Sequence, residues 1–294
     1  MTGAGTWHIT GDLDQFLTHA DDFLRTNPAL HTVPLTVTHA LRSRGMHLYG
    51  EAPPVFGALE RDGAVRAAFF RTPPGRLMLT ALTTEEADAL AVQLADRGDK
   101  LPGVMAERDT ASTFAQAWRR QTGATPGLHA RQRLYRLTEL TLPHPTPPGH
   151  PRVAKAKDRE QLMCWYGEFV EAIGGDGGVT HDPGEWAEAR IAYGGITLWE
   201  TPDGTPVSMA GVTAKVAGQI RVAPVYTPAE LRGHGYAGAV TAEVSRVARA
   251  AGAAEVLLFT DLANPTSNAL YQRIGYRAVV DFARYDFRKG AGPR

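Results

Sequence analysis

The stretch "TPAELRGHGYAGAV", Thr227–Val240, places three glycines where a predicted strand gives way to a predicted helix. Glycine inside a helix costs up to about 1 kcal/mol relative to alanine, so this composition weakens the start of the helix. A backbone without side chains lets an anion approach the unpaired N–H groups at a helix N-terminus. The stretch therefore predicts either an anion-binding turn or a glycine-rich turn without a ligand.

The overall composition excludes several classes of function. Lysine plus arginine and aspartate plus glutamate number 31 each among 294 residues, so we expect no nucleic acid and no membrane as a partner. The single cysteine, Cys164, rules out an internal disulfide and a cysteine-based zinc site, and we expect no metal. The sequence shows neither a signal peptide nor a segment with the apolar length of a membrane span, which predicts a cytoplasmic protein.

A proline-rich segment near the middle of the chain suggests a division into two domains. Residues 142–151, "LPHPTPPGHP", contain five prolines, and proline pushes both itself and the preceding residue toward extended structure. Such a segment is typical of a semi-rigid linker. Since 294 residues suffice for two domains of ordinary size, we predict domains at residues 1–141 and 152–294.

Hydrophobic periodicity gives the two halves the same order of elements. Each half is predicted to contain two helices, three strands, a helix, a strand, a helix and a final strand. The helix predicted over residues 158–173 is expected to end at Gly174–Gly178. This repetition predicts a structural tandem repeat, and each half is expected to be a mixed α+β unit.

The spacing of the glycines matches a dinucleotide-binding fingerprint. Gly233, Gly235 and Gly238 fit G-x-G-x-x-G, and Asp261 after the next strand could imitate the acid that binds ribose. In that motif, however, the strand enters the first glycine almost directly, whereas Thr227–Arg232 intervene here. A nicotinamide-dependent oxidoreductase therefore remains an alternative, and the match alone is weak.

Two motifs together carry a resemblance to a known family. The pattern R-x-x-G-x-A begins at Arg232, and "NPTSNALYQRIGY" follows at Asn264–Tyr276 after one helix and one strand. In this combination the chain resembles the GNAT superfamily of N-acyltransferases, over residues 152 to about 287. The resemblance implies a mostly antiparallel mixed sheet flanked by helices, and the tandem pattern extends this expectation to the first half.

The same resemblance implies a site for coenzyme A. The N–H groups and the positive helix end would hold the pyrophosphate, and the strand end before the loop would bond the pantetheine amides as an added pseudo-strand. The residues that this assigns to the cofactor are Val225, Tyr226, Thr227, Arg232, Gly233, His234, Gly235, Tyr236, Ala237, Asn264, Asn268 and Tyr271.

The chemistry of acyl transfer from a thioester requires a proton for the departing thiolate. In the GNAT resemblance Tyr271 supplies it, and Asn264 or Asn268 would bond the pantetheine or phosphate arm. Asn264, Asn268 and Tyr271 are spaced by four and three residues, which places them on one helical face. A capped helix with a buried tyrosine explains the same pattern, because asparagine before proline is a good N-cap.

The general base is less clearly marked. Glu171 lies near the end of the first helix of the second half, where the acceptor site of the resembled family usually forms, and we assign it as the candidate base. Glu168 shares its face, and Glu200 ends a strand beside the hairpin. Each of the three is also readily explained as a solvated carboxylate.

The first half has no glycine loop at the corresponding helix start. Glu85 and Glu86 stand there instead, and their charges would repel a pyrophosphate. We therefore predict one competent site, in the second half. The predicted activity is transfer of an acetyl group from acetyl-CoA to a primary amine of a small molecule or peptide, by a monomer or homodimer. A non-catalytic acyl-CoA-binding module is the principal alternative.

Overall fold

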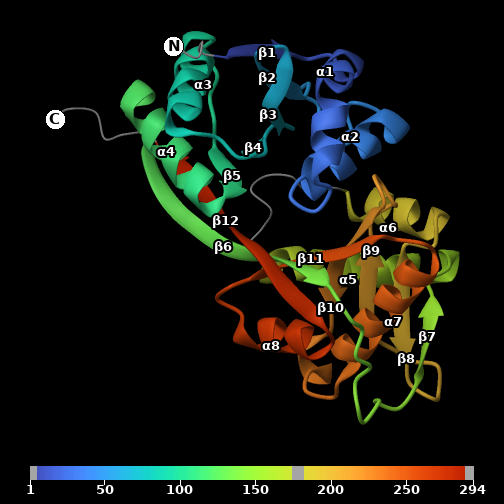
Figure 1. Cartoon of the computed structure of the whole chain (residues 1–294). Coiled ribbons are helices and arrows are strands. Elements are labelled where there is room, and N and C mark those ends of the chain that lie inside the picture. Colours follow the sequence, from blue (N-terminus) through green and yellow to red (C-terminus); the bar gives the residue numbers. More distant parts are fainter. Residues whose placement is uncertain (1–4, 174–181, 289–294) are drawn as a thin grey trace. The chain divides into compact units, whose positions relative to one another are not determined.

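The computed structural model describes residues 5–173 and 182–288 (Figure 1). The described residues form two compact units, the first made of residues 5–132 and 280–288 and the second of residues 133–173 and 182–279. Each unit contains a mostly antiparallel sheet covered by helices, with one parallel pair of strands in each, β4 with β5 and β10 with β11. The predicted α+β fold class is confirmed.

The first unit is built around a core between its sheet and two helices. Its buried centre includes Leu90, Phe114 and Trp118, which line the sheet-facing sides of α3 and α4. The strand order is β1-β2-β3-β4-β5, followed by β12. The elements are β1 (Thr6–Thr10), α1 (Leu13–Thr26), α2 (Thr32–Arg44), β2 (Val55–Arg61), β3 (Ala64–Arg71), β4 (Leu77–Leu79), α3 (Thr84–Asp96), β5 (Gly103–Glu107), α4 (Arg108–Thr122) and β6 (Thr125–Leu137).

The second unit carries two hydrophobic clusters. One includes Val240 and Val244 of α7, and the other includes Leu162 and Trp165 of α5. The strand order is β6-β11-β10-β9-β8-β7. The elements are β7 (His150–Val153), α5 (Arg159–Ala172), α6 (Pro183–Ala192), β8 (Ile196–Glu200), β9 (Pro206–Val212), β10 (Gln219–Tyr226), α7 (Tyr236–Ala250), β11 (Glu255–Asp261), α8 (Pro265–Arg273) and β12 (Tyr276–Arg288).

The last strand, β12, passes from one unit into the other. Its first residues belong to the second unit, whereas residues from Val280 onward belong to the first. There, Phe282–Asp286 pair antiparallel with Gly103–Glu107 of β5. The boundary between the units at residues 132 and 133 likewise falls inside β6.

The repeated order of elements predicted from the sequence is confirmed, with one strand added. β1 precedes the helices of the first unit as β7 precedes those of the second, and the sequence analysis missed it. Helical periodicity predicts burial of Ile173, Val247 and Ala251, but all three are exposed, Val247 by 48% and Ile173 by 39%. The residues predicted to end α5, Gly174–Gly178, lie outside the described part of the chain.

The proline-rich residues 142–151 belong to the second unit. They pack locally, since Trp199 Nε1 donates to the carbonyl of Pro148 at 3.1 Å, and Pro147 lies next to Gly235. Their predicted role as a linker between two independently folding domains stays a prediction.

Candidate functional site

The strand β10 contains a bulge that changes which face its side chains reach. Val222 pairs with Val212 of β9 and Val225 pairs with Ala210, so two residues of β10 oppose one residue of β9. Pro224 lies in this bulge, and proline has no backbone N–H to donate to a ladder hydrogen bond. A proline inside a strand predicts that the strand is weakened or bulged, and the bulge confirms this interpretation of Pro224.

Beyond the bulge, β10 separates from its other neighbour. The parallel pairing of β10 with β11 covers only Gln219–Arg221 and Glu255–Leu257. β10 continues to Tyr226 and β11 to Asp261 without further pairing between them. The two strands therefore splay toward their carboxyl ends, and Val225–Thr227, predicted to bond an extended ligand arm, lie where β10 ends at this opening.

The glycine-rich loop follows directly from this strand end. Gly233 and Gly235 have φ values of 83° and 84°, in the left-handed region that favours glycine, and Gly235 is the N-cap of α7. A Cβ at Gly233 would meet no atom within 4 Å, so packing against protein does not demand the absence of a side chain there. The loop leaves open space beside its backbone.

The donors of this loop have no acceptors in the described part of the protein. No hydrogen bond joins the N–H groups of Gly233, His234 or Gly235 to a described residue, and Gly235 provides no side-chain cap for α7. The first-turn N–H groups of Tyr236 and Ala237 are also left without an intrahelical acceptor. These groups, at the positive end of the helix, form a fitting cradle for a pyrophosphate.

Two side chains of the loop have defined positions. Arg232 Nε donates to the carbonyl of Thr227 at 3.1 Å, which fixes this exposed guanidinium beside the end of β10. His234 Nδ1 lies 3.2 Å from the carbonyl of Leu231, and its ring stacks on Tyr236 with centroids 5.7 Å apart. The charge of Arg232 is therefore held beside the end of β10, whereas the ring of His234 packs against Tyr236.

Tyr271 is buried in the same cluster as the start of α7. Its side chain is 8% exposed, and its ring meets that of Tyr276 edge to face at 6.1 Å. Burial raises the pKa of Tyr271 to about 12, so the hydroxyl stays protonated at neutral pH. No described residue forms a hydrogen bond with this hydroxyl, which leaves its proton free for another acceptor.

The two asparagines on the same helix make structural hydrogen bonds. Asn264 caps α8 by accepting from the N–H of Ser267 at 3.0 Å, as its sequence context predicted. Asn268 Nδ2 donates to the carbonyls of Asp261 and Asn264 at 2.7 and 2.8 Å, and its Oδ1 accepts from the hydroxyl of Tyr135 at 2.9 Å. The Asn268 amide therefore holds α8 against β11 and β6.

The candidate carboxylates of α5 differ in their surroundings. Glu171 is exposed, and its carboxylate has no hydrogen-bond partner among the described residues. Glu168 accepts from the hydroxyl of Tyr226 at 2.7 Å and contacts the thiol of Cys164 at 3.5 Å. Sequence reasoning missed this Tyr226–Glu168 pair, and no periodicity could have shown it, because the bulge in β10 decides where Tyr226 points.

Glu200 is held in a buried ion-pair cluster. Arg152 donates to Glu200 at 2.5 Å and to both carboxylate oxygens of Asp158 at 2.7 and 2.9 Å. The hydrogen bond from Arg152 lowers the pKa of Glu200, although burial opposes it. Glu200 is only 6% exposed, so the description of it as a solvated carboxylate was wrong, and its paired charge suits a structural role.

The first unit uses the corresponding helix start differently. Thr83 and Glu86 form a capping box at the N-terminus of α3, with the Glu86 carboxylate accepting from the N–H of Thr83 at 2.8 Å. Glu86 is buried, and Arg61 lies 3.5 Å from it. The N-terminus of α3 is thus capped by a carboxylate of the protein itself. The N-cap of α7 in the second unit is Gly235, which has no side chain to cap the helix.

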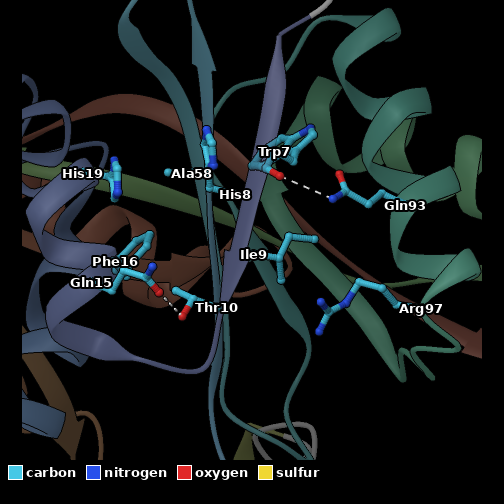
Figure 2. Close-up of a pocket in the computed structure, with 10 residues that line it drawn as sticks. All are labelled: Trp7, His8, Ile9, Thr10, Gln15, Phe16, His19, Ala58, Gln93 and Arg97. Atoms are coloured by element: carbon cyan, nitrogen blue, oxygen red, sulfur yellow. Dashed lines mark hydrogen bonds between the residues drawn. The ribbon is translucent and has the colours of Figure 1, made fainter.

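A pocket of about 340 Å³ lies in the first unit and contains none of the predicted site residues (Figure 2). Figure 2 shows that its lining residues lie on both sides of the edge strand β1, with Trp7 and Ile9 on one side and His8 and Thr10 on the other. Within residues 5–173 and 182–288, no cluster of three or more His, Cys, Asp or Glu side chains could hold a metal ion. None of the helices described there is long and apolar enough to cross a membrane.

Comparison with known proteins identifies the fold. A model of the FR47-like protein family matches residues 206–285, from β9 into β12. A GNAT-family acetyltransferase from Colwellia psychrerythraea has a TM-score of 0.59 at 11% identity, covering 96% of this chain and 100% of its own. A tandem GNAT protein from the clavulanic acid biosynthesis pathway has a TM-score of 0.55 at 12% identity, covering 98% and 100%. The chain has the tandem GNAT fold.

A GCN5-related N-acetyltransferase from Sphaerobacter thermophilus adds to this GNAT likeness, with a TM-score of 0.62 at 18% identity and coverage of 96% and 95%. No curated protein matches the sequence significantly. The GNAT fold expected from the two sequence motifs is confirmed, and the FR47-like match includes both motifs.

Proposed function

We propose that the second unit transfers an acetyl group from acetyl-CoA to a primary amine of a small molecule or peptide. The observation that carries this proposal is the splay between β10 and β11, which opens directly before a loop of unpaired N–H groups. An opening between strands accommodates an extended amide-bearing arm, and the loop accommodates the anionic group at the end of such an arm.

The donor would be held mainly by backbone. The strand end at Val225–Thr227 would bond the pantetheine amides, and Arg232–Ala237 would hold the pyrophosphate. Since Arg232 is already fixed by the carbonyl of Thr227, its charge is placed beside the loop before a donor arrives. Asn264 and Asn268 would contribute through the position of α8, because the Asn268 amide is occupied by protein partners.

The chemistry would need two proton movements. A neutral amine attacks the thioester carbonyl, the C–S bond breaks and the departing thiolate takes a proton. Tyr271 is assigned as the donor of that proton, because its hydroxyl is protonated and has no described protein partner. The proton lost from the amine nitrogen restores the tyrosine by way of solvent.

A glycine substitution tests the donor site. Coenzyme A is expected to raise the melting temperature of the full chain, and Gly235→Asp should abolish that shift by repelling phosphate. Gly204→Asp is the matched control, because Gly204 lies in the β8–β9 turn with a similar φ of 88° and open space around it. The control has the same backbone strain and added charge but should keep the shift.

The outcomes separate the alternatives. A normal coenzyme A shift in a folded Gly235→Asp variant contradicts the phosphate site. A shift produced by NADH but not by coenzyme A would support the oxidoreductase instead. Tight coenzyme A binding without thiol release from acetyl-CoA for any member of a broad amine panel would contradict the acyltransferase and support a binding module.

A further inference from the structure

A carboxylate lies against the end of β10 on the sheet face opposite α7 and Tyr271. Ile220 and Val222 of β10 belong to the cluster that contains Val240 of α7 and Tyr271 of α8. Tyr226 belongs instead to the cluster formed by α5, α6, β8 and β9. Side chains alternate along a strand, so the extra residue in the bulge is what turns Tyr226 to the α5 face.

The bulge thereby brings Tyr226 to Glu168. The Tyr226 hydroxyl donates to Glu168 Oε2 at 2.7 Å, and the Tyr226 ring packs near Trp165 with centroids 6.3 Å apart. The backbone of Tyr226 is fixed as well, because Ser208 Oγ donates to the carbonyl of Tyr226 at 3.0 Å. Glu168 is exposed, so this position is held by protein while the carboxylate remains open to solvent.

We propose that Glu168 binds the protonated primary amine of the acceptor and takes its proton before attack, with Tyr226 as the residue that positions it. This inference rests on the proposed acyltransferase activity. It assigns the acceptor class as amines that are cationic in solution, since a carboxylate binds an ammonium group by charge-assisted hydrogen bonds that are stronger than its bonds to a neutral amine. It also places the acceptor on the α5 face of the splay, opposite Tyr271.

The proton balance is complete with these two residues and water. The ammonium group loses one proton to Glu168, which releases it to solvent. The neutral nitrogen then forms its bond to the carbonyl carbon and becomes the amide, and its second proton passes through water to restore Tyr271. Tyr271 protonates the sulfur as the C–S bond breaks, so the products are an acetylated amine, a thiol and one released proton.

Among the described residues, the titratable groups near Glu168 are Cys164 and Tyr226, which contact it, and Glu171, one turn further along the same helix. Cys164 lies on the same helix, and the hydrogen bond to Glu168 raises the pKa of its thiol, so Cys164 is a neutral donor rather than a nucleophile. From the loop, the charge of Arg232 lowers the pKa of Tyr226 and the charge of Glu230 raises it. Burial, and then the bond to Glu168, raise the pKa of Tyr226 to about 12, so this hydroxyl remains a donor.

The test compares Glu168→Gln with Glu160→Gln, an exposed glutamate in the first turn of the same helix. Thiol release from acetyl-CoA is measured with a panel of primary alkylamines and with aromatic amines, which are neutral near pH 7. Glu168→Gln should lower kcat/KM for alkylamines by roughly 10²–10⁴-fold near neutral pH, whereas Glu160→Gln should leave it unchanged. The loss should shrink as pH rises toward the alkylamine pKa and should be small for aromatic amines.

Tyr226→Phe gives an independent measurement of positioning, because it keeps the ring beside Trp165 and removes only the hydroxyl. It should lower kcat more than it changes KM, with the same pH dependence in weaker form. Equal loss for aromatic and alkyl amines, wild-type kinetics of Glu168→Gln, or the same defect in Glu171→Gln instead would overturn the assignment of Glu168. Absence of any amine acetylation by the wild type would contradict the proposed function itself.

Discussion

At the scale of single residues, the distinctive group is a buried phenol without a described hydrogen-bond partner. Substitution of Tyr271 by phenylalanine keeps the ring against Tyr276 and removes only the hydroxyl. If proton donation to sulfur limits the rate, kcat should fall by roughly 10²–10⁴-fold while coenzyme A affinity stays unchanged. The loss should diminish for thioesters with better leaving groups; an equal loss for every donor would show that the hydroxyl only positions the cofactor.

The same burial predicts how stability depends on pH. The pKa of Tyr271 is about 12 in the folded protein and close to 10 when exposed, so the folded state holds this proton more tightly. Its contribution of about 3 kcal/mol is fully present below pH 10 and is lost as pH rises through 12. Chemical unfolding of Tyr271→Phe should therefore show a shallower loss of stability across that range than the wild type. Identical slopes would contradict the raised pKa.

At the scale of elements, α8 depends on one amide. Asn268→Asp keeps an oxygen for the Tyr135 hydroxyl but replaces the Nδ2 donor with a carboxylate facing the carbonyls of Asp261 and Asn264. We expect the free energy of unfolding to fall by about 1–3 kcal/mol. Asn264→Asp is the control, since it keeps the capping oxygen and adds a favourable charge at the helix N-terminus. Equal stability of the two variants, measured by urea unfolding, would contradict this role.

The strand β10 shows why local sequence patterns predicted part of the site and not the rest. Glycines at 233 and 235 and the N-cap at Asn264 depend on neighbouring residues, and their sequence signals were sufficient. The pairing of Tyr226 with Glu168 depends on a bulge that reverses alternation over the last residues of the strand. Pro224 signalled irregularity, but not the number of extra residues, and that number decides which face Tyr226 reaches.

At the scale of the whole molecule, the sequence revealed the repeated order of elements. It did not reveal that the last strand, β12, passes from the second unit into the first. Hydrophobic periodicity shows that a segment is a strand without showing which strand it pairs with. "RAVVDFARYDF" at residues 277–287 was assigned to the second half, as its position in the chain suggested. Its final residues instead pair with β5, and Ala283 lies in the core of the first unit.

Truncation tests this assignment. A chain ending at Val279 would lose the strand beside β5, the buried Ala283 and the ion pair of Asp286 with Arg76. The first unit should then lose its cooperative unfolding transition, and the amides of Gly103–Glu107 should exchange with solvent far faster, because an unpaired strand edge replaces a hydrogen-bonded one. A chain ending at Arg288 is the control and should keep both properties. Slow exchange at β5 in the shorter chain would show that the first unit folds without β12.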